Sequence, residues 1–289
     1  MKNIKILLLF VFILFFGYKN NAQSTEIGLG LGFTTYWGDL NSPGVTSNLS
    51  NNSGLAIQLS ARKMLNNIFG VKGAFTYGSM KGDDANSNVD WQRLRNLSFK
   101  STISELSLMG EFHPFNLISG KINTLSPYMT AGVSGLRFNP KTIYNGNYVS
   151  LQPLGTEGQG IVGMPDKYSL YAFSVAIGGG MKLIINDKMS INGDIIMRSS
   201  NTDYLDDVST NYVNYDDLSA SNGSISAILA NRMHEFLGQS EPVQLPTGTN
   251  RGGARYKDYY FVSMLTVNIT LESNGGRFGR GSRVICPKF

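Results

Sequence analysis

The sequence of 289 residues contains a single cysteine, Cys286, so no disulfide within the chain can stabilise the fold. Only 16% of the residues are charged, and the mean hydropathy is close to zero, at −0.10. A long hydrophobic run is also missing, because the apolar stretch at residues 6–18 has about 13 residues, whereas a bilayer-spanning helix needs roughly 20. The chain therefore resembles neither a disulfide-rich domain nor a helical membrane protein.

The first 22 residues are predicted to be a signal peptide. Lys2 and Lys5 precede the short apolar run, and Ala22 supplies a small residue at which cleavage is expected. No cysteine lies near this position, which excludes a lipoprotein anchor. We therefore expect an exported protein.

The positive charge of the sequence is concentrated at its end. Removal of residues 1–22 takes away three lysines and leaves 22 basic and 20 acidic residues. Four of the basic residues lie in a predicted tail at 273–289, which contains no acid. The remaining body is close to neutral, so the high pI gives no support to nucleic-acid binding.

Glycine and aromatic residues are plentiful, with 33 Gly, 16 Phe and 14 Tyr, which favours an all-β protein. Residues 26–40 place Ile27, Leu29, Leu31 and Phe33 on one face of a strand, with glycines on the other. The same alternation recurs and predicts strands at 26–40, 53–65, 68–80, 96–113, 127–138, 169–185, 188–199 and 258–272. An apolar face opposite a small or polar face is typical of a lipid-facing barrel.

The fourth predicted strand, residues 96–113, contains a change of phase. Leu97, Phe99 and Ile103 share one face, but the next apolar residues, Leu106 and Leu108, occupy the other. We therefore predict a β-bulge near Glu105.

The connections between these strands alternate in length. Residues 66–67 and 186–187 are short turns and 116–126 is a modest link, whereas 41–52, 81–95, 139–168 and 200–257 are long. Outer-membrane barrels have short periplasmic turns and long external loops. We predict an eight-stranded antiparallel transmembrane β-barrel over residues 23–272, followed by a basic periplasmic tail at 273–289.

Two consequences follow from this architecture. Eight strands enclose a lumen that side chains fill, so a diffusion pore is not expected. A soluble sandwich or lipocalin-like barrel fits less well, because the predicted strands of about 10 to 15 residues exceed the usual five or six. Within the long external loop at 201–257, the spacing of apolar residues predicts a short helix that Ser224 caps and Gly238 ends.

Acidic and histidine residues offer few candidates for chemistry. Asp203, Asp206 and Asp207 suggest a hard-cation site, but no calcium-loop pattern is present, and a solvated acidic loop or a barrel rim with one turn-capping Asp is favoured. His113 and His234 fall on opposite sides of the membrane and cannot share a site. We therefore predict no metal, no cofactor and no enzymatic activity.

The tail allows two interpretations. One is a disordered basic end. The other is a docking segment, because guanidinium groups pair with carboxylates and an unpaired cysteine in an oxidising compartment can form an intermolecular disulfide. The predicted partner-binding residues are Arg277, Arg280, Arg283, Cys286, Pro287 and Lys288.

Several strings in this order along one chain resemble the PorG family of the type IX secretion and gliding-motility machinery of Bacteroidota. They are EIGLGLGFTTYWGDLN, HPFN, TDYLDDVS, KDYYF and CPKF. The motif positions are Trp37, Gly38, Asp39, His113, Pro114, Thr202, Asp203, Tyr204, Asp206 and Asp207.

The resemblance implies a non-enzymatic outer-membrane barrel that anchors or organises a periplasmic ring of PorK or GldK and PorN or GldN proteins. Assignment of the tail to ring contact comes from topology and charge. The alternative is a generic small barrel that acts through its external loops as an adhesin or surface-binding module. A lipid-modifying barrel enzyme is the weakest hypothesis.

Overall fold

The computed structural model describes residues 24–120, 122–255 and 257–273. The predicted signal peptide lies outside these ranges. So do the tail residues to which partner binding was assigned: Arg277, Arg280, Arg283, Cys286, Pro287 and Lys288.

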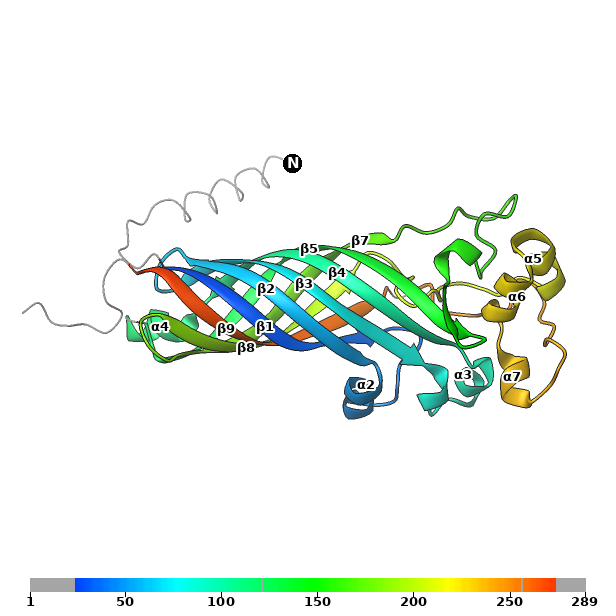
Figure 1. The fold of residues 1–289 in the computed structure, drawn as a ribbon, viewed down its shortest axis with the longest axis horizontal. Helices are drawn as coiled ribbons and strands as arrows, with labels where there is room; N and C mark the ends of the chain where they lie inside the picture. The colour runs from blue at the N-terminus through cyan, green and yellow to red at the C-terminus, as the bar shows by residue number, and fades with distance from the viewer. Residues whose placement is uncertain (1–23, 121, 256, 274–289) are drawn as a thin grey trace, which may run out of the picture.

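Within the described ranges, nine antiparallel strands form one sheet, and eight of them close into a barrel (Figure 1). The barrel closes where β1 pairs with β9, from Ser24 opposite Ser273 to Trp37 opposite Tyr259. The predicted eight-stranded antiparallel barrel is therefore confirmed. Its strands are β1 (Ser24–Trp37), β2 (Ser53–Met64), β3 (Phe69–Asp83), β4 (Ser98–Phe112), β5 (Leu125–Tyr144), β7 (Tyr171–Ile184), β8 (Met189–Ser200) and β9 (Tyr259–Ser273).

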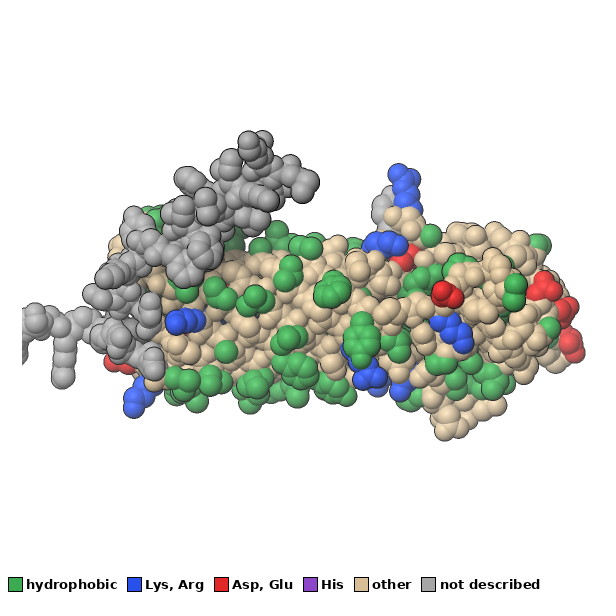
Figure 2. All heavy atoms as spheres, turned by 90° about the horizontal axis from the view of Figure 1, so that it is seen from above, with side chains coloured by type: hydrophobic (Ala, Val, Ile, Leu, Met, Phe, Trp, Pro, Cys, Tyr) green, Lys and Arg blue, Asp and Glu red, His purple; other side chains and the backbone are tan. Residues whose placement is uncertain are grey.

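Side chains alternate along each strand as the sequence predicts. On β2, Leu55 is 75% exposed while Arg62 is 2% exposed, because neighbouring side chains point to opposite faces of the sheet. Figure 2 shows hydrophobic side chains spread along the outside of the barrel, with charged groups mostly toward its ends. The outer face is an apolar belt and the inner face is largely polar.

Glycines on the inward face of β1 permit neighbouring side chains to cross the lumen. A Cβ atom at Gly28 would lie 2.4 Å from Asn268 Oδ1, and one at Gly30 would lie 2.8 Å from Thr266 Oγ1. Larger residues would collide with these groups. The glycine repeat of the first strand therefore fits the crowded interior of a small barrel.

The β-bulge predicted near Glu105 is wrong. The pairing of β4 is continuous with β3 and with β5 through this residue. Phe99 and Ile103 point inward and are buried, whereas Leu106 and Leu108 point outward. The apolar residues switch from one face of β4 to the other because the inner face is itself apolar toward Ser98. The backbone register does not change.

The predicted loop at 139–168 contains a strand that the sequence analysis missed. β5 continues to Tyr144, and β6 (Asn147–Ser150) pairs with its extension beyond the barrel. Asn145 and Gly146 connect them, with φ of 50° and 78°. Asn-Gly is a strong signal for a two-residue hairpin turn, so the sequence contained the evidence.

Short and long connections lie at opposite ends of the barrel, which we call the turn end and the loop end. The turn end carries residues 65–68, 113–120, 122–124 and 185–188, together with the start of β1 and the end of β9. Both four-residue turns use one device: Asn66 Oδ1 accepts from the Ile68 amide at 2.8 Å, and Asn186 Oδ1 accepts from the Lys188 amide at 2.9 Å.

The single helix predicted in the last long loop is two helices, which break at Asn231 and end at Gly238 as expected. The predicted cap is wrong, because Ser224 is the first residue of α6 and the N-cap position is Gly223. The described helices are α2 (Val45–Asn51), α3 (Asp90–Arg95), α4 (Pro114–Ser119), α5 (Tyr215–Asn222), α6 (Ser224–Ala230) and α7 (Met233–Leu237), with 3₁₀ turns η1 (Asp84–Asn86) and η2 (Gln152–Leu154). Apart from α4, all of them lie at the loop end (Figure 1).

Among the described residues, no helix combines the length and the apolar character needed to cross a membrane.

Candidate functional site

The half of the lumen near the turn end is filled with ion pairs. Arg62 lies 2.8 Å from Glu111 Oε2 and 3.5 Å from Glu26 Oε2, and Lys182 lies 2.6 Å from the same Glu26 oxygen. Lys72 contacts Asp194 at 2.7 Å. All six side chains are buried, and three cations balance three acids, as buried charges require.

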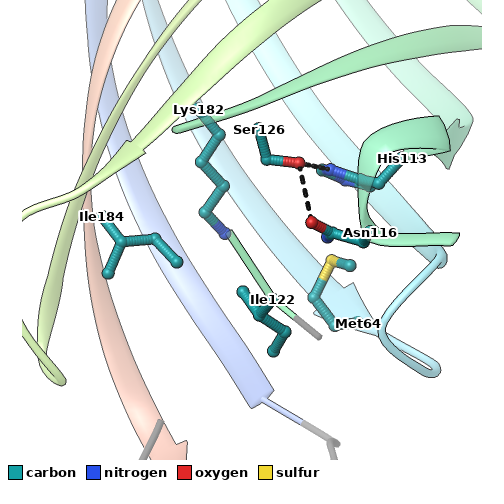
Figure 3. A pocket seen from close by; sticks show the side chains of 7 residues that line it. All are labelled: Met64, His113, Asn116, Ile122, Ser126, Lys182 and Ile184. Atoms are coloured by element: carbon teal, nitrogen blue, oxygen red, sulfur yellow. Dashed lines mark hydrogen bonds between the residues drawn. The ribbon is translucent and has the colours of Figure 1, made fainter. Parts of the chain in front are cut away.

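A small cavity opens beside this network at the turn end (Figure 3). His113 Nδ1 lies 3.0 Å from Ser126 Oγ, and His113 Nε2 lies 3.7 Å from Glu111 Oε2. A serine, a histidine and a glutamate therefore meet at a place that the sequence analysis did not anticipate. The cavity measures about 20 Å³, which holds about one water molecule and no acyl substrate.

The other half of the lumen is closed by an apolar plug. We use this name for a set of buried residues near the loop ends of the strands, in which Tyr36 meets Phe99 edge to face at a ring distance of 4.8 Å. Its main members are Tyr36, Met80, Phe99, Ile103, Phe138 and Tyr260. Leu205 and Val208, from the last long loop, pack into the same cluster and seal it.

Two buried aspartates lie above the plug. The Tyr36 hydroxyl lies 2.6 Å from Asp206 Oδ2 and 3.0 Å from Asp258 Oδ1. Burial raises the pKa of Asp206 well above its usual range, and the neighbouring Asp258 raises it further. Burial likewise raises the pKa of Asp258. The pair therefore retains a proton at pH values where an exposed aspartate is ionised.

Two arginines hold the long loops together over this cluster. Arg95 binds both carboxylate oxygens of Asp84, at 2.7 and 2.8 Å, and donates to the backbone oxygen of Arg251. Arg251 in turn contacts Glu157 Oε1 at 2.9 Å and the backbone oxygen of Asp207 at 2.6 Å. Because both guanidinium groups are buried and bridge several loops, the loop end is one packed layer.

The acidic string after β8 is buried, so its interpretation as a solvated loop is wrong. Asp203, Asp206 and Asp207 are at most 3% exposed. The alternative of a rim residue that caps a turn holds for Asp206, whose Oδ1 accepts from the Val208 amide at 2.9 Å. Within the described ranges, no group of three His, Cys, Asp or Glu side chains is placed to bind a metal ion.

The family-motif residues separate into two groups. Gly38, Asp39 and the stretch 202–207 gather at the loop end, where Asp39 Oδ2 accepts from the Gly253 amide at 2.8 Å. Trp37 is partly exposed and stacks on Tyr259 with ring centroids 5.9 Å apart. His113 and Pro114 lie at the turn end. His234 is in α7, so the two histidines are at opposite ends of the barrel as predicted.

The sequence analysis did not identify most of the buried charged residues that stabilise the turn end and, separately, the loop end. Glu26, Lys72 and Asp194 lie on β1, β3 and β8, at positions where the alternation of side chains points inward. This alternation could have identified them as lumen residues. Arg95 and Arg251 lie outside the strands, where no periodic pattern indicates burial.

A polar pocket of about 260 Å³ lies on the outside of the loop end. It is formed between the loop that follows β1 and the loop before α3. Its lining includes Asp39, Asn41, Ser42, Asn88 and Gln92.

The apolar belt is bounded by aromatic residues at both ends, with Trp37 and Tyr259 near the loops and Phe69 and Phe112 near the turns. A lipid-facing belt, aromatic girdles and a filled lumen define an outer-membrane β-barrel. The chain belongs to the family of the domain of unknown function DUF6089, whose model matches residues 5–226. No curated protein matches the sequence.

Solved structures with a similar fold include three outer-membrane or surface proteins. Ail, the attachment invasion locus protein of Yersinia pestis, in complex with a heparin analogue, is 13% identical, with a TM-score of 0.40 over 86% of this chain and 99% of that one. Neisserial surface protein A is 9% identical, with a TM-score of 0.39 over 85% and 96%. OprG from Pseudomonas aeruginosa is 12% identical, with a TM-score of 0.41 over 88% and 100%.

Proposed function

We propose that this barrel is a non-enzymatic anchor in the outer membrane that organises the periplasmic ring of a type IX secretion or gliding machinery. The observation that carries the proposal is the closed lumen. Because the apolar plug and the packed loops fill one half and ion pairs fill the other, no substrate passes through the barrel. Its work must then be done by its surfaces.

The turn end offers a surface suited to a protein partner. Phe115, Leu117 and Ile118 on α4 are exposed, and Ile118 reaches 83%. Asn116 of the same helix is buried and donates to the backbone oxygen of Asn67 at 2.8 Å, which fixes α4 across the mouth of the barrel. Exposed apolar groups held on a fixed segment are typical of interaction sites. The proposed partners are proteins of PorK or GldK type and of PorN or GldN type.

The tail predicted at 273–289 is assigned to the same contact from its charge, because Ser273, at the end of β9, lies at the turn end. Removal of residues 274–289 retains the pairing of Ser24 with Ser273, so the barrel itself should still close. We expect this truncation to release the ring proteins from the barrel and to stop secretion. The measurement is co-purification of ring proteins from crosslinked outer membranes, together with a secretion assay.

The matched control shortens the mostly exposed segment at 239–248 in the last long loop, which should leave ring retention unchanged. A truncated protein that folds, reaches the outer membrane and still retains the ring would contradict the proposal. Substitution of Cys286→Ser separates a disulfide from charge pairing, because only the disulfide gives a larger species on non-reducing gels.

The polar pocket at the loop end favours a second candidate function, binding of a polar ligand outside the cell. Asp39, Asn41 and Asn88 present carboxylate and amide groups in a pocket held by the packed loops. If this is the main activity, Asn88→Ala should reduce attachment of cells to a surface while ring retention is unchanged. Equal attachment of the variant and the parent would count against this candidate.

A further inference from the structure

The apolar belt is interrupted by a groove near the turn end, on the outer face of β3, β4, β5 and β7. It has a volume of about 310 Å³. Its outer wall includes Phe69 and Phe112, whose rings are 5.4 Å apart, together with Met129 and Ile177. The groove is therefore a feature of the surface that faces away from the lumen.

The floor of the groove is formed by two small residues on adjacent strands, Gly110 and Ala131, which pair with each other. The wall residue Ile177 pairs with Ala131 and ends this row on the side of β7. The next row toward the loop end contains Leu108, Val133 and Val175, which are more than half exposed. Small side chains between two rows of large ones create the hollow.

The groove lies at the turn-side margin of the belt, and on β7 apolar residues continue past it. Met181 and Leu183 are exposed apolar residues on β7, and they are closer to the turn end than the groove is. Apolar side chains therefore border the groove on both the turn side and the loop side. Water in this position would find few hydrogen-bonding partners, because the surroundings are hydrocarbon.

We propose that this groove binds one acyl chain of a phospholipid in the leaflet near the turn end. The walls are aromatic and aliphatic, the floor is flat backbone, and the volume falls in the range of pockets that hold small ligands. A flexible acyl chain fills such a hollow by dispersion contacts with Met129 and the two phenylalanines. The bound lipid restores a continuous apolar surface around the barrel.

The test uses native mass spectrometry of the full mature chain in detergent, with added phosphatidylethanolamine as the probe. We expect the parent protein to retain one tightly bound lipid, and Gly110→Leu to lose it several-fold. The new side chain has room at the backbone, because the nearest atom to a Cβ at Gly110 is Ala131 O at 3.8 Å. Ala131→Leu fills the same floor and serves as the second variant if Gly110→Leu does not fold.

Gly193→Leu is the matched control. Gly193 lies at an outward-facing position of β8, and a Cβ atom there would meet nothing within 4 Å. It does not line the groove. The control should retain lipid as the parent does. Equal retention by the floor variants and the control would overturn the proposal. So would a parent that binds only detergent, or one that uses this face to form a dimer that Gly110→Leu dissociates.

Discussion

The two halves of the barrel interior differ in the balance of ionic and apolar side chains that fill them. Near the turn end, Arg62, Lys72 and Lys182 neutralise three acids, and polar atoms such as Asp194 Oδ1 have no partner among the described side chains. Near the loop end, aromatic and aliphatic residues fill most of the lumen, and one buried ion pair, between Arg198 and Glu105 at 3.1 Å, lies among them. The same closed arrangement of strands therefore encloses a mainly ionic half and a mainly apolar half, and the inward-facing residues determine the difference.

The largest expected effect comes from breaking the balance of charge in the turn half. Arg62→Met leaves Glu111 and Glu26 short of a buried cation, so the free energy of unfolding should fall by about 3–5 kcal/mol. Urea unfolding in detergent, followed by the mobility shift of the barrel on gels, measures this.

The double variant Arg62→Met with Glu111→Met restores neutrality and should recover most of the loss. Arg137→Ala removes an exposed arginine and controls for the loss of a cation alone. A double variant no more stable than Arg62→Met would show that charge balance is not what holds this half together.

The next effect tests the dry half. Ile103→Ala removes a fully buried side chain from the plug, and the free energy of unfolding should fall by about 2–4 kcal/mol. Leu106→Ala, on the outer face of the same strand, should cost clearly less in detergent. If the two substitutions were equally costly, the plug would not be a packed core.

A smaller effect depends on pH. Burial raises the pKa of Asp207 to about 6, while the nearby Arg251 opposes the rise. An acid whose pKa is raised by folding binds its proton more tightly in the folded state, so stability is lost as pH rises from about 4 to about 6. The loop end should lose on the order of 1–3 kcal/mol over this window.

Protease resistance of the loops, followed as a function of pH, measures this change. Asp207→Asn should flatten the profile, since the amide does not titrate. An unchanged profile in the variant would assign the pH dependence to other groups of the loop end, such as Asp206 and Asp258.

The smallest effect concerns the turns. Asn186→Ala removes a side-chain acceptor from the turn between β7 and β8 and should cost about 0.5–1.5 kcal/mol. Asn186→Asp keeps the acceptor and should restore stability. Thermal unfolding of both variants in one detergent makes the comparison.

The fold was predictable because its strongest signal is local. Alternation such as that of Leu55, Ile57 and Leu59 depends only on which face meets lipid. The same rule failed at Phe99 and Ile103, where the inner face of β4 is also apolar. The change from polar to apolar inward residues was therefore misinterpreted as a bulge. β6 was missed although its Asn-Gly turn is visible in the sequence.

The ends of the barrel were less predictable than its wall. Asp203 and Asp206 were found as a motif but not as buried groups, because their burial depends on loops that are distant in sequence. Arg95 donates to the backbone oxygen of Arg251, which is 156 residues away in the sequence, and no local pattern predicts such a contact. The cavity beside His113 likewise depends on Ser126 from the next strand.

The pairing of Ser24 with Ser273 has a consequence for how the chain reaches its final state. Two sheet edges remain unpaired until the last strand has been made, and such edges invite association with other chains. Closing a loop of this length delays folding, since non-local contacts form late. Biogenesis must therefore shield both edges during export and join them only in the membrane.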